Sequence, residues 1–80
     1  MKLSVPDVLL LVREYYSKPG NGAGGSLHIA LDEGNVKDGH INSCIEYALE
    51  RGDAEGAVLG EILLDMSKTQ RMKLCNAKKG

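Results

Sequence analysis

The stretch Gly20-Asn21-Gly22-Ala23-Gly24-Gly25-Ser26-Leu27-His28-Ile29-Ala30-Leu31-Asp32-Glu33-Gly34-Asn35 decides how this 80-residue chain is organised. It comprises a glycine-rich loop, a short apolar run that contains a histidine, and an acidic turn. The segments on both sides of it have the hydrophobic spacing of amphipathic helices. The stretch therefore joins two helical parts of the chain, and it is where we expect a site to lie.

The apolar run that follows the glycines has the alternation of a short β-strand. In a strand, Leu27, Ile29 and Leu31 would pack into the core. His28 and Asp32 would then lie side by side on the accessible face, next to the glycine-rich loop. Because the run is so short, a helical or irregular conformation is also compatible with the pattern.

Amphipathic helices are predicted on the two sides of this stretch, over residues 5–17, 36–51, 54–66 and 68–75. The side chains expected to cap them are Ser4 with Asp7, Asn35 with Asp38, Asp53, and Ser67 with Gln70. The third helix contains Gly56 and Gly60, and each costs about 1 kcal/mol relative to alanine in a helix interior. Either another helix or a ligand approaches the backbone there, or a partly exposed surface tolerates the two glycines.

Each of the first three predicted helices has an apolar face that should point inward. These faces comprise Val5, Val8, Leu9, Leu11, Val12, Tyr15 and Tyr16 on the first helix, Ile41, Cys44, Ile45, Ala48 and Leu49 on the second, and Val58, Leu59, Ile62, Leu63 and Met66 on the third. Leu10 falls outside the first face. In so small a protein, an exposed leucine is a candidate for a contact between subunits.

The expected fold class is mainly α, with three to four short helices and one short β-strand or extended segment after the glycine-rich loop. An alternative is a small α+β fold in which the strand pairs across a homodimer. Residues 1–75 are expected to form a single small helical domain, and residues 76–80 a basic, frayed tail. A chain of this size buries only about 60% of its unfolded surface. The small core therefore favours a homo-oligomer.

The composition argues against several classes of protein. The longest fully apolar run, residues 8–12, is far too short to span a membrane, and the N-terminus lacks the apolar region of a signal peptide. Two cysteines without a disulfide-dense pattern suit the reducing cytoplasm. From Lys68 onward there are five basic residues and no acid, whereas the rest carries five basic and eleven acidic residues. We interpret this basic end as a solubilising terminus and expect no nucleic-acid partner.

The glycine-rich loop is the first candidate ligand site. Gly20, Gly22 and Gly25 match the pattern G-x-G-x-x-G, but a helix precedes them and an apparent strand follows. The match is therefore not the dinucleotide fingerprint, which needs the opposite order of elements. A loop of this kind can still present backbone amides to an anion. The alternative is a flexible connector.

The second candidate is one edge of the helix predicted over residues 36–51. His40, Cys44, Tyr47 and Arg51 follow a single line along it. Arginine binds phosphate or carboxylate bidentately, and tyrosine supplies a stacking face and a hydroxyl group. The alternative is a boundary row that a neighbouring segment half covers. The predicted ligand-binding residues at the two candidates together are Gly22, Gly24, Gly25, Ser26, His28, Asp32, Asn35, His40, Tyr47 and Arg51.

No metal site, cofactor or catalytic set is predicted. A zinc site formed by His28, His40, Cys44 and Cys75 is chemically sensible, but the closely spaced ligand pairs typical of zinc sites are missing. Cys44 belongs to an inward face, where cysteine is usually unreactive. The chain is therefore not expected to be an enzyme.

The central motif resembles a group of short accessory proteins encoded by bacteriophages and prophages. The resemblance rests on residues 24–35, with the pattern GGxLHIxLDxGN, and on residues further along the chain, namely Asp38, Cys44, Gly52-Asp53 and Gln70-Arg71. It covers about residues 15–74. What it implies is a setting: small accessory phage proteins often act on host defence, either by capturing nucleotide signals or by blocking a defence complex.

The resemblance thus implies a phage-type anti-defence protein in the host-cell cytoplasm. In the first interpretation it is a homo-oligomer that sequesters a small anionic, nucleotide-like ligand. An alternative is an anti-CRISPR-like protein that blocks a host defence complex through protein contacts made by its acidic body. A further alternative is a small hydrolase that depends on a His/Asp pair.

Overall fold

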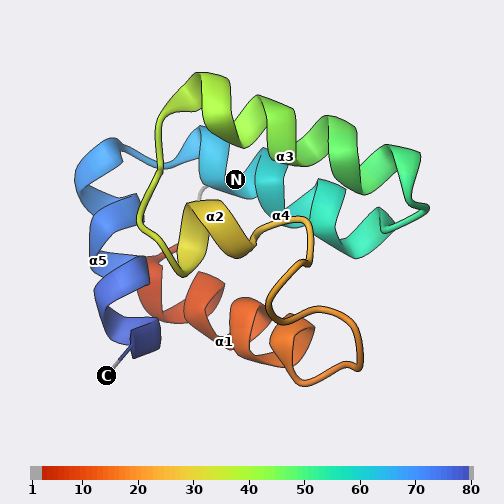
Figure 1. Cartoon of the computed structure of the whole chain (residues 1–80). Helices are drawn as coiled ribbons and strands as arrows, with labels where there is room; N and C mark the ends of the chain where they lie inside the picture. Colours follow the sequence, from red (N-terminus) through yellow and green to blue (C-terminus); the bar gives the residue numbers. More distant parts are fainter. Residues whose placement is uncertain (1–2, 80) are drawn as a thin grey trace.

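Helices dominate the computed structural model, which describes residues 3–79 (Figure 1). In chain order they are α1 (Val5–Tyr16), α2 (His28–Leu31), α3 (Asp38–Glu50), α4 (Ala54–Asp65) and α5 (Lys68–Lys79). The short helix α2 packs against both α3 and α5, and it lies near the centre of the view in Figure 1. The mainly helical fold class is confirmed for the described residues. Met1, Lys2 and Gly80, which belong to the predicted domain and tail, lie outside them.

The apolar run after the glycine-rich loop is not a strand, so that prediction is wrong. It forms the single helical turn α2, in which the amide of Asp32 donates to the carbonyl of His28 at 2.8 Å. Leu27, Ala30 and Leu31 are buried, whereas Ile29 is exposed. A lone strand would leave its backbone groups unpaired, while a helical turn pairs them within itself. The alternative of strand pairing across a homodimer therefore lacks its strand in residues 3–79.

Three of the four predicted helix caps are present. Ser4 and Asp53 accept hydrogen bonds from first-turn amides, and Ser67 forms a reciprocal capping box with Gln70. The prediction that Asn35 caps the next helix is wrong, because α3 begins at Asp38 and its N-cap residue, Lys37, makes no side-chain cap hydrogen bond. A side chain from a distant part of the chain fixes this end of α3 instead.

That side chain is Arg71 on α5, which is only 2% exposed. Its guanidinium donates to the carbonyls of Leu63 at 2.7 Å and Leu64 at 3.2 Å, at the end of α4. It also donates to the carbonyl of Val36 at 2.8 Å and to Asp38 at 2.5 Å, at the start of α3. Arg71 thus satisfies carbonyl groups that a helix end leaves unpaired, and it joins three helices.

The two glycines of α4 allow close packing. A Cβ at Gly60 would overlap the side chain of Ile45 on α3, and a Cβ at Gly56 would overlap the carboxylate of Asp53. The hydroxyl group of Tyr15 lies 3.1 Å from the same position at Gly56. The helix-propensity cost of the two glycines is therefore offset by close packing. At Gly60 the close neighbour is α3, and at Gly56 it is the pair of Asp53 and Tyr15.

Besides Ile29, three residues of the predicted helix faces lie on the surface instead of pointing inward: Leu11, Leu49 and Val58. Helix α5 also continues four residues beyond its predicted end at Cys75, and Lys78 on it forms an ion pair with Asp32. Among residues 3–79, no helix is long and apolar enough to cross a membrane.

Candidate functional site

Asp53 anchors the glycine-rich loop to the body of the protein. Its carboxylate accepts hydrogen bonds from the hydroxyl groups of Tyr15 at 2.5 Å and Ser26 at 3.0 Å, and from the amide of Gly56 at 3.0 Å. Burial acts to raise the pKa of Asp53, but these hydrogen bonds outweigh it and lower the pKa. Burial and the neighbouring carboxylate raise the pKa of Tyr15 to about 12. The loop is thus attached to an ionised carboxylate that is itself the cap of α4.

The loop also makes hydrogen bonds at its start and within its turn. The side-chain amide of Asn21 donates to the carbonyl of Tyr15 at 2.9 Å, and the backbone amide of Gly25 donates to the carbonyl of Gly22 at 2.8 Å. A Cβ at Gly25 would lie 2.9 Å from that carbonyl oxygen, so only glycine fits there. Because the amide of Gly25 is used within the turn, it is not free to bind an anion.

A pocket of about 260 Å³ opens between this loop, α2 and α3. We call it the glycine-loop pocket, and its lining residues are Gly24, Gly25, Ser26, His28, Ile29, His40, Ser43, Cys44 and Tyr47. Six of the ten predicted ligand-binding residues are among them. The structure therefore brings two imidazoles, a phenol ring and hydroxyl groups to one hollow, from segments on both sides of the acidic turn.

The other four predicted residues, Gly22, Asp32, Asn35 and Arg51, do not line the pocket. Gly22 accepts the turn hydrogen bond of the loop, and the amide of Asn35 donates to the carbonyl of Ile29 at 3.3 Å. Both residues therefore serve the backbone turns on either side of the pocket. Asp32 and Arg51 lie next to lining residues: Asp32 contacts His28, and Arg51 contacts Tyr47 and Ser26.

Asp32 holds the imidazole of His28. Its carboxylate lies 2.6 Å from Nδ1 of His28, one helical turn away, and it also forms an ion pair with Lys78. Burial acts to raise the pKa of Asp32, but the hydrogen bonds from Lys78 and His28 lower it overall. The Nε2 atom of His28 lies 3.5 Å from the carboxylate of Glu33. The histidine ring is thus oriented by an ionised carboxylate that is positioned from α5.

Arg51 stands at the Tyr47 end of the pocket. Its Cζ atom lies 5.7 Å from the centroid of the Tyr47 ring, and its guanidinium reaches the hydroxyl oxygen of Ser26 and the carbonyl of Gly20, both at 3.4 Å. Both hydrogen bonds are longer than usual for nitrogen and oxygen, and long hydrogen bonds are weak. The guanidinium thus lies beside the pocket, where it makes these two long hydrogen bonds and is attracted to the nearby carboxylate of Asp53.

Three lining residues were not predicted as ligand-binding residues: Ile29, Ser43 and Cys44. Ser43 lies three residues after His40 and four before Tyr47, so the same helical spacing could have identified it. Ile29 was assigned to the core because the run was treated as a strand. Burial raises the pKa of the Cys44 thiol, although a backbone hydrogen bond with Ala30 opposes the change. Cys44 is therefore a neutral thiol in the wall of the pocket.

A larger hollow, of about 320 Å³, lies elsewhere, between α1 and α4. Its lining contains no histidine, cysteine or arginine, so the glycine-loop pocket is the better candidate for small-molecule chemistry. No group of three or more His, Cys, Asp or Glu residues is placed to hold a metal ion within residues 3–79. Comparisons of the chain with protein-family models, curated proteins and solved structures gave no match.

Proposed function

We propose that this protein binds and sequesters a small anionic, nucleotide-like ligand in the glycine-loop pocket. The observation that supports the proposal is the convergence of His28, His40 and Tyr47 on one hollow, with Arg51 at the Tyr47 end. Ligand pockets combine apolar surface with a few convergent polar groups, and this pocket has that composition. We also propose that the protein acts as a homo-oligomer in the host-cell cytoplasm, as a phage-type anti-defence protein.

The size of the pocket limits the ligand. Pockets for small molecules usually measure roughly 300–1,000 Å³, and about 260 Å³ lies just below that range. A mononucleotide-sized ligand with part of its surface exposed suits this volume better than a dinucleotide. Its base would stack on the exposed ring of Tyr47 or lie between the two imidazoles. Asp32 holds Nδ1 of His28, so His28 would contact the base through Nε2, and His40 would contact it through either ring nitrogen.

The phosphate would be bound by Arg51. Its two 3.4 Å hydrogen bonds within the protein are weak, so exchanging them for a bidentate contact with phosphate costs little. Sequestration requires affinity and no turnover. The neutral thiol of Cys44 suits such a role.

Calorimetric titration tests the proposal with adenosine and guanosine 5′-monophosphates, and with adenosine and inorganic phosphate as partial ligands. We expect at least one mononucleotide to bind more tightly than either partial ligand. The Arg51→Ala variant should bind it about 10- to 100-fold more weakly, which is the effect of losing one or more charge-assisted hydrogen bonds. Lys73→Ala, which removes an exposed cation from α5, is the matched control and should bind as the wild type does.

Two results would overturn the proposal. One is the absence of heat for every mononucleotide, and the other is equal affinity of the wild type and Arg51→Ala. Either result would leave the alternative, a protein that blocks a host defence complex by direct contact, as the interpretation to pursue.

A further inference from the structure

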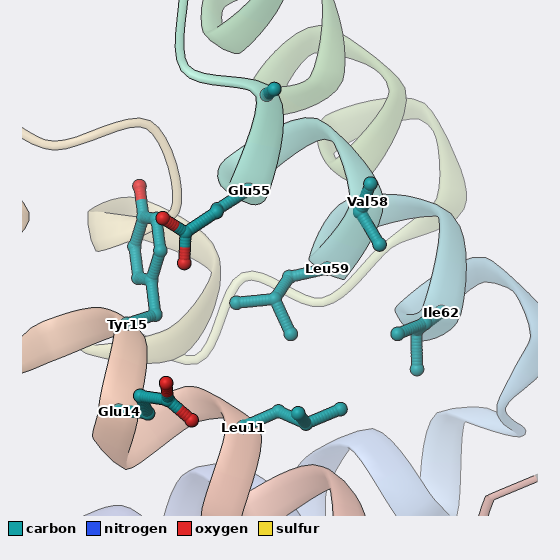
Figure 2. Close-up of a pocket in the computed structure, with 8 residues that line it drawn as sticks. Leu11, Glu14, Tyr15, Glu55, Val58, Leu59 and Ile62 are labelled. Atoms are coloured by element: carbon teal, nitrogen blue, oxygen red, sulfur yellow. The ribbon is translucent and has the colours of Figure 1, made fainter.

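The hollow between α1 and α4 is a groove with an apolar end and an acidic end (Figure 2). We call it the α1–α4 groove, and its lining residues are Leu11, Glu14, Tyr15, Ala54, Glu55, Val58, Leu59 and Ile62. Figure 2 shows Leu11 and Glu14 on one side, facing Glu55 and Leu59 on the other. Val58 and Leu11 are exposed even though both are apolar. Such a surface is typical of a contact site for another protein chain.

The spacing along α1 fixes the order of the two ends. Glu14 follows Leu11 by three residues, which is about 4.5 Å along a helix axis. On α4, Glu55 precedes Leu59 by four residues. Glu55 forms an ion pair with Lys18, so α1 and α4 run in opposite directions and their two carboxylates lie at the same end. Because Glu55 is paired with Lys18, the carboxylate that a partner can meet at this end is that of Glu14. A partner that presents an apolar side chain and, one helical turn away, a basic one would complement the groove.

The chain itself carries that pattern directly beside the groove. Leu10 is 66% exposed, the largest exposed fraction among the large apolar side chains of residues 3–79. Arg13, three residues further along α1, is also exposed. The projecting pair is Leu10, an apolar residue, followed one helical turn later by the basic Arg13. The groove presents the apolar Leu11, followed one turn later by the acidic Glu14, so the two pairs have the same spacing and opposite charge. Since the projecting pair and the receiving groove are adjacent on one surface, the surface is complementary to a second copy of itself.

We propose that the α1–α4 groove is the contact face of a twofold-symmetric homodimer. In this dimer Leu10 of each protomer enters the groove of the other, where it packs on Leu11 and Val58. If the twofold axis runs parallel to α1, the two α1 helices lie side by side and point in the same direction. Equivalent residues then lie at the same height along the axis. Arg13 then lies at the level of the partner's Glu14 and Glu55. A twofold interface requires that each contact occur twice, and this pairing meets the requirement.

A dimer contact of ordinary size would cover only a small part of the protomer. A standard interface buries about 800 Å² on each partner, and the described protomer exposes 4668 Å² in total. The dimer would therefore cover about a sixth of the surface of each protomer. None of the residues that line the glycine-loop pocket lies in this contact. The inference names the contact of the proposed homo-oligomer and does not depend on the ligand.

Sedimentation velocity of the full chain at micromolar concentration tests the dimer. The wild type should sediment as a dimer, and Leu10→Glu should lower the association constant by about 30-fold or more, as expected for a central contact residue. Leu49→Glu is the matched control, because Leu49 is 64% exposed but lies on α3. It should remain dimeric. Unchanged helical circular dichroism in both variants would show that neither effect is due to unfolding.

A charge exchange tests the register of the two helices. Arg13→Glu and Glu14→Arg should each weaken the dimer, and the double variant should recover much of the lost association, because the two residues would then form the same ion pair in reverse. A monomeric wild type, a larger open assembly, or equal loss of dimer in Leu49→Glu and Leu10→Glu would each overturn the inference. Titration with mononucleotides separates these outcomes from a failure of the proposed function, since monomeric Leu10→Glu retains a complete glycine-loop pocket.

Discussion

At the residue scale, Asp53 is the side chain on which the glycine-rich loop depends. One carboxylate oxygen accepts from Tyr15 on α1 and from Ser26 in the loop, and the other accepts from the amide of Gly56. The helix cap was predictable from local spacing. The contacts to Tyr15 and Ser26 were not, because they join positions 38 and 27 residues apart. Asp53 therefore contributes to stability in two ways, as the N-cap of α4 and as the acceptor for the hydroxyl groups of Tyr15 and Ser26.

Replacing Asp53 with asparagine should reduce stability in a pH-dependent way. The folded protein lowers the pKa of Asp53, so its contribution is complete above the unfolded value of about 3.9 and is lost as the pH falls through the folded pKa. Asp53→Asn should therefore be less stable than the wild type by about 1–2 kcal/mol near neutral pH, because a neutral acceptor replaces a charged one. The difference should close as the pH falls below about 4 and passes through the lowered pKa of the folded state. Urea unfolding across this range measures it, and a constant difference would contradict the assigned role.

At the element scale, the long helices follow from periodicity and the short one does not. The predicted α1 and α4 agree with the observed bounds to within one residue, because a capping side chain marks the start of each. The apolar residues in the run at 27–31 fit both the two-residue period of a strand and the 3.6-residue period of a helix. The conformation of the run is decided by packing against α3 and α5. The start of α3 was misplaced for a similar reason, since Arg71 fixes it from 33 residues away.

Close packing between α3 and α4 predicts a specific effect at Gly60. Alanine is the better helix former by about 1 kcal/mol, but its Cβ would overlap Ile45. We expect Gly60→Ala to destabilise the protein by about 1–3 kcal/mol in urea unfolding, the usual cost of overpacking. Gly39→Ala in the first turn of α3, where a Cβ meets nothing within 4 Å, is the control and should be neutral or stabilising. Equal effects at the two positions would show that packing against Ile45 is unimportant.

At the scale of the whole molecule, the position of the pocket was more predictable than its composition. The acidic turn joins the histidine-containing run to the next helix, and His28 and His40, which are both among the predicted ligand-binding residues, line the glycine-loop pocket. Arg51 was expected to line it, but the guanidinium lies over Tyr47 and reaches back to the loop. Such placement depends on hydrogen bonds between segments, which residue spacing along one helix does not describe.

Arg71 joins the ends of three helices, so its replacement should affect the stability of the entire fold. Lysine keeps the charge, but its single ammonium group cannot reach the carbonyls of Leu63, Leu64 and Val36 together. We expect Arg71→Lys to lose about 2–4 kcal/mol in urea unfolding, because buried carbonyls are left without donors. Asp38→Asn is the control. Its carboxylate is 67% exposed and should contribute less than about 1 kcal/mol to the pair. If the two variants lose the same stability, Arg71 stabilises the fold mainly through its exposed ion pair with Asp38. The hydrogen bonds to the buried carbonyls would then contribute little.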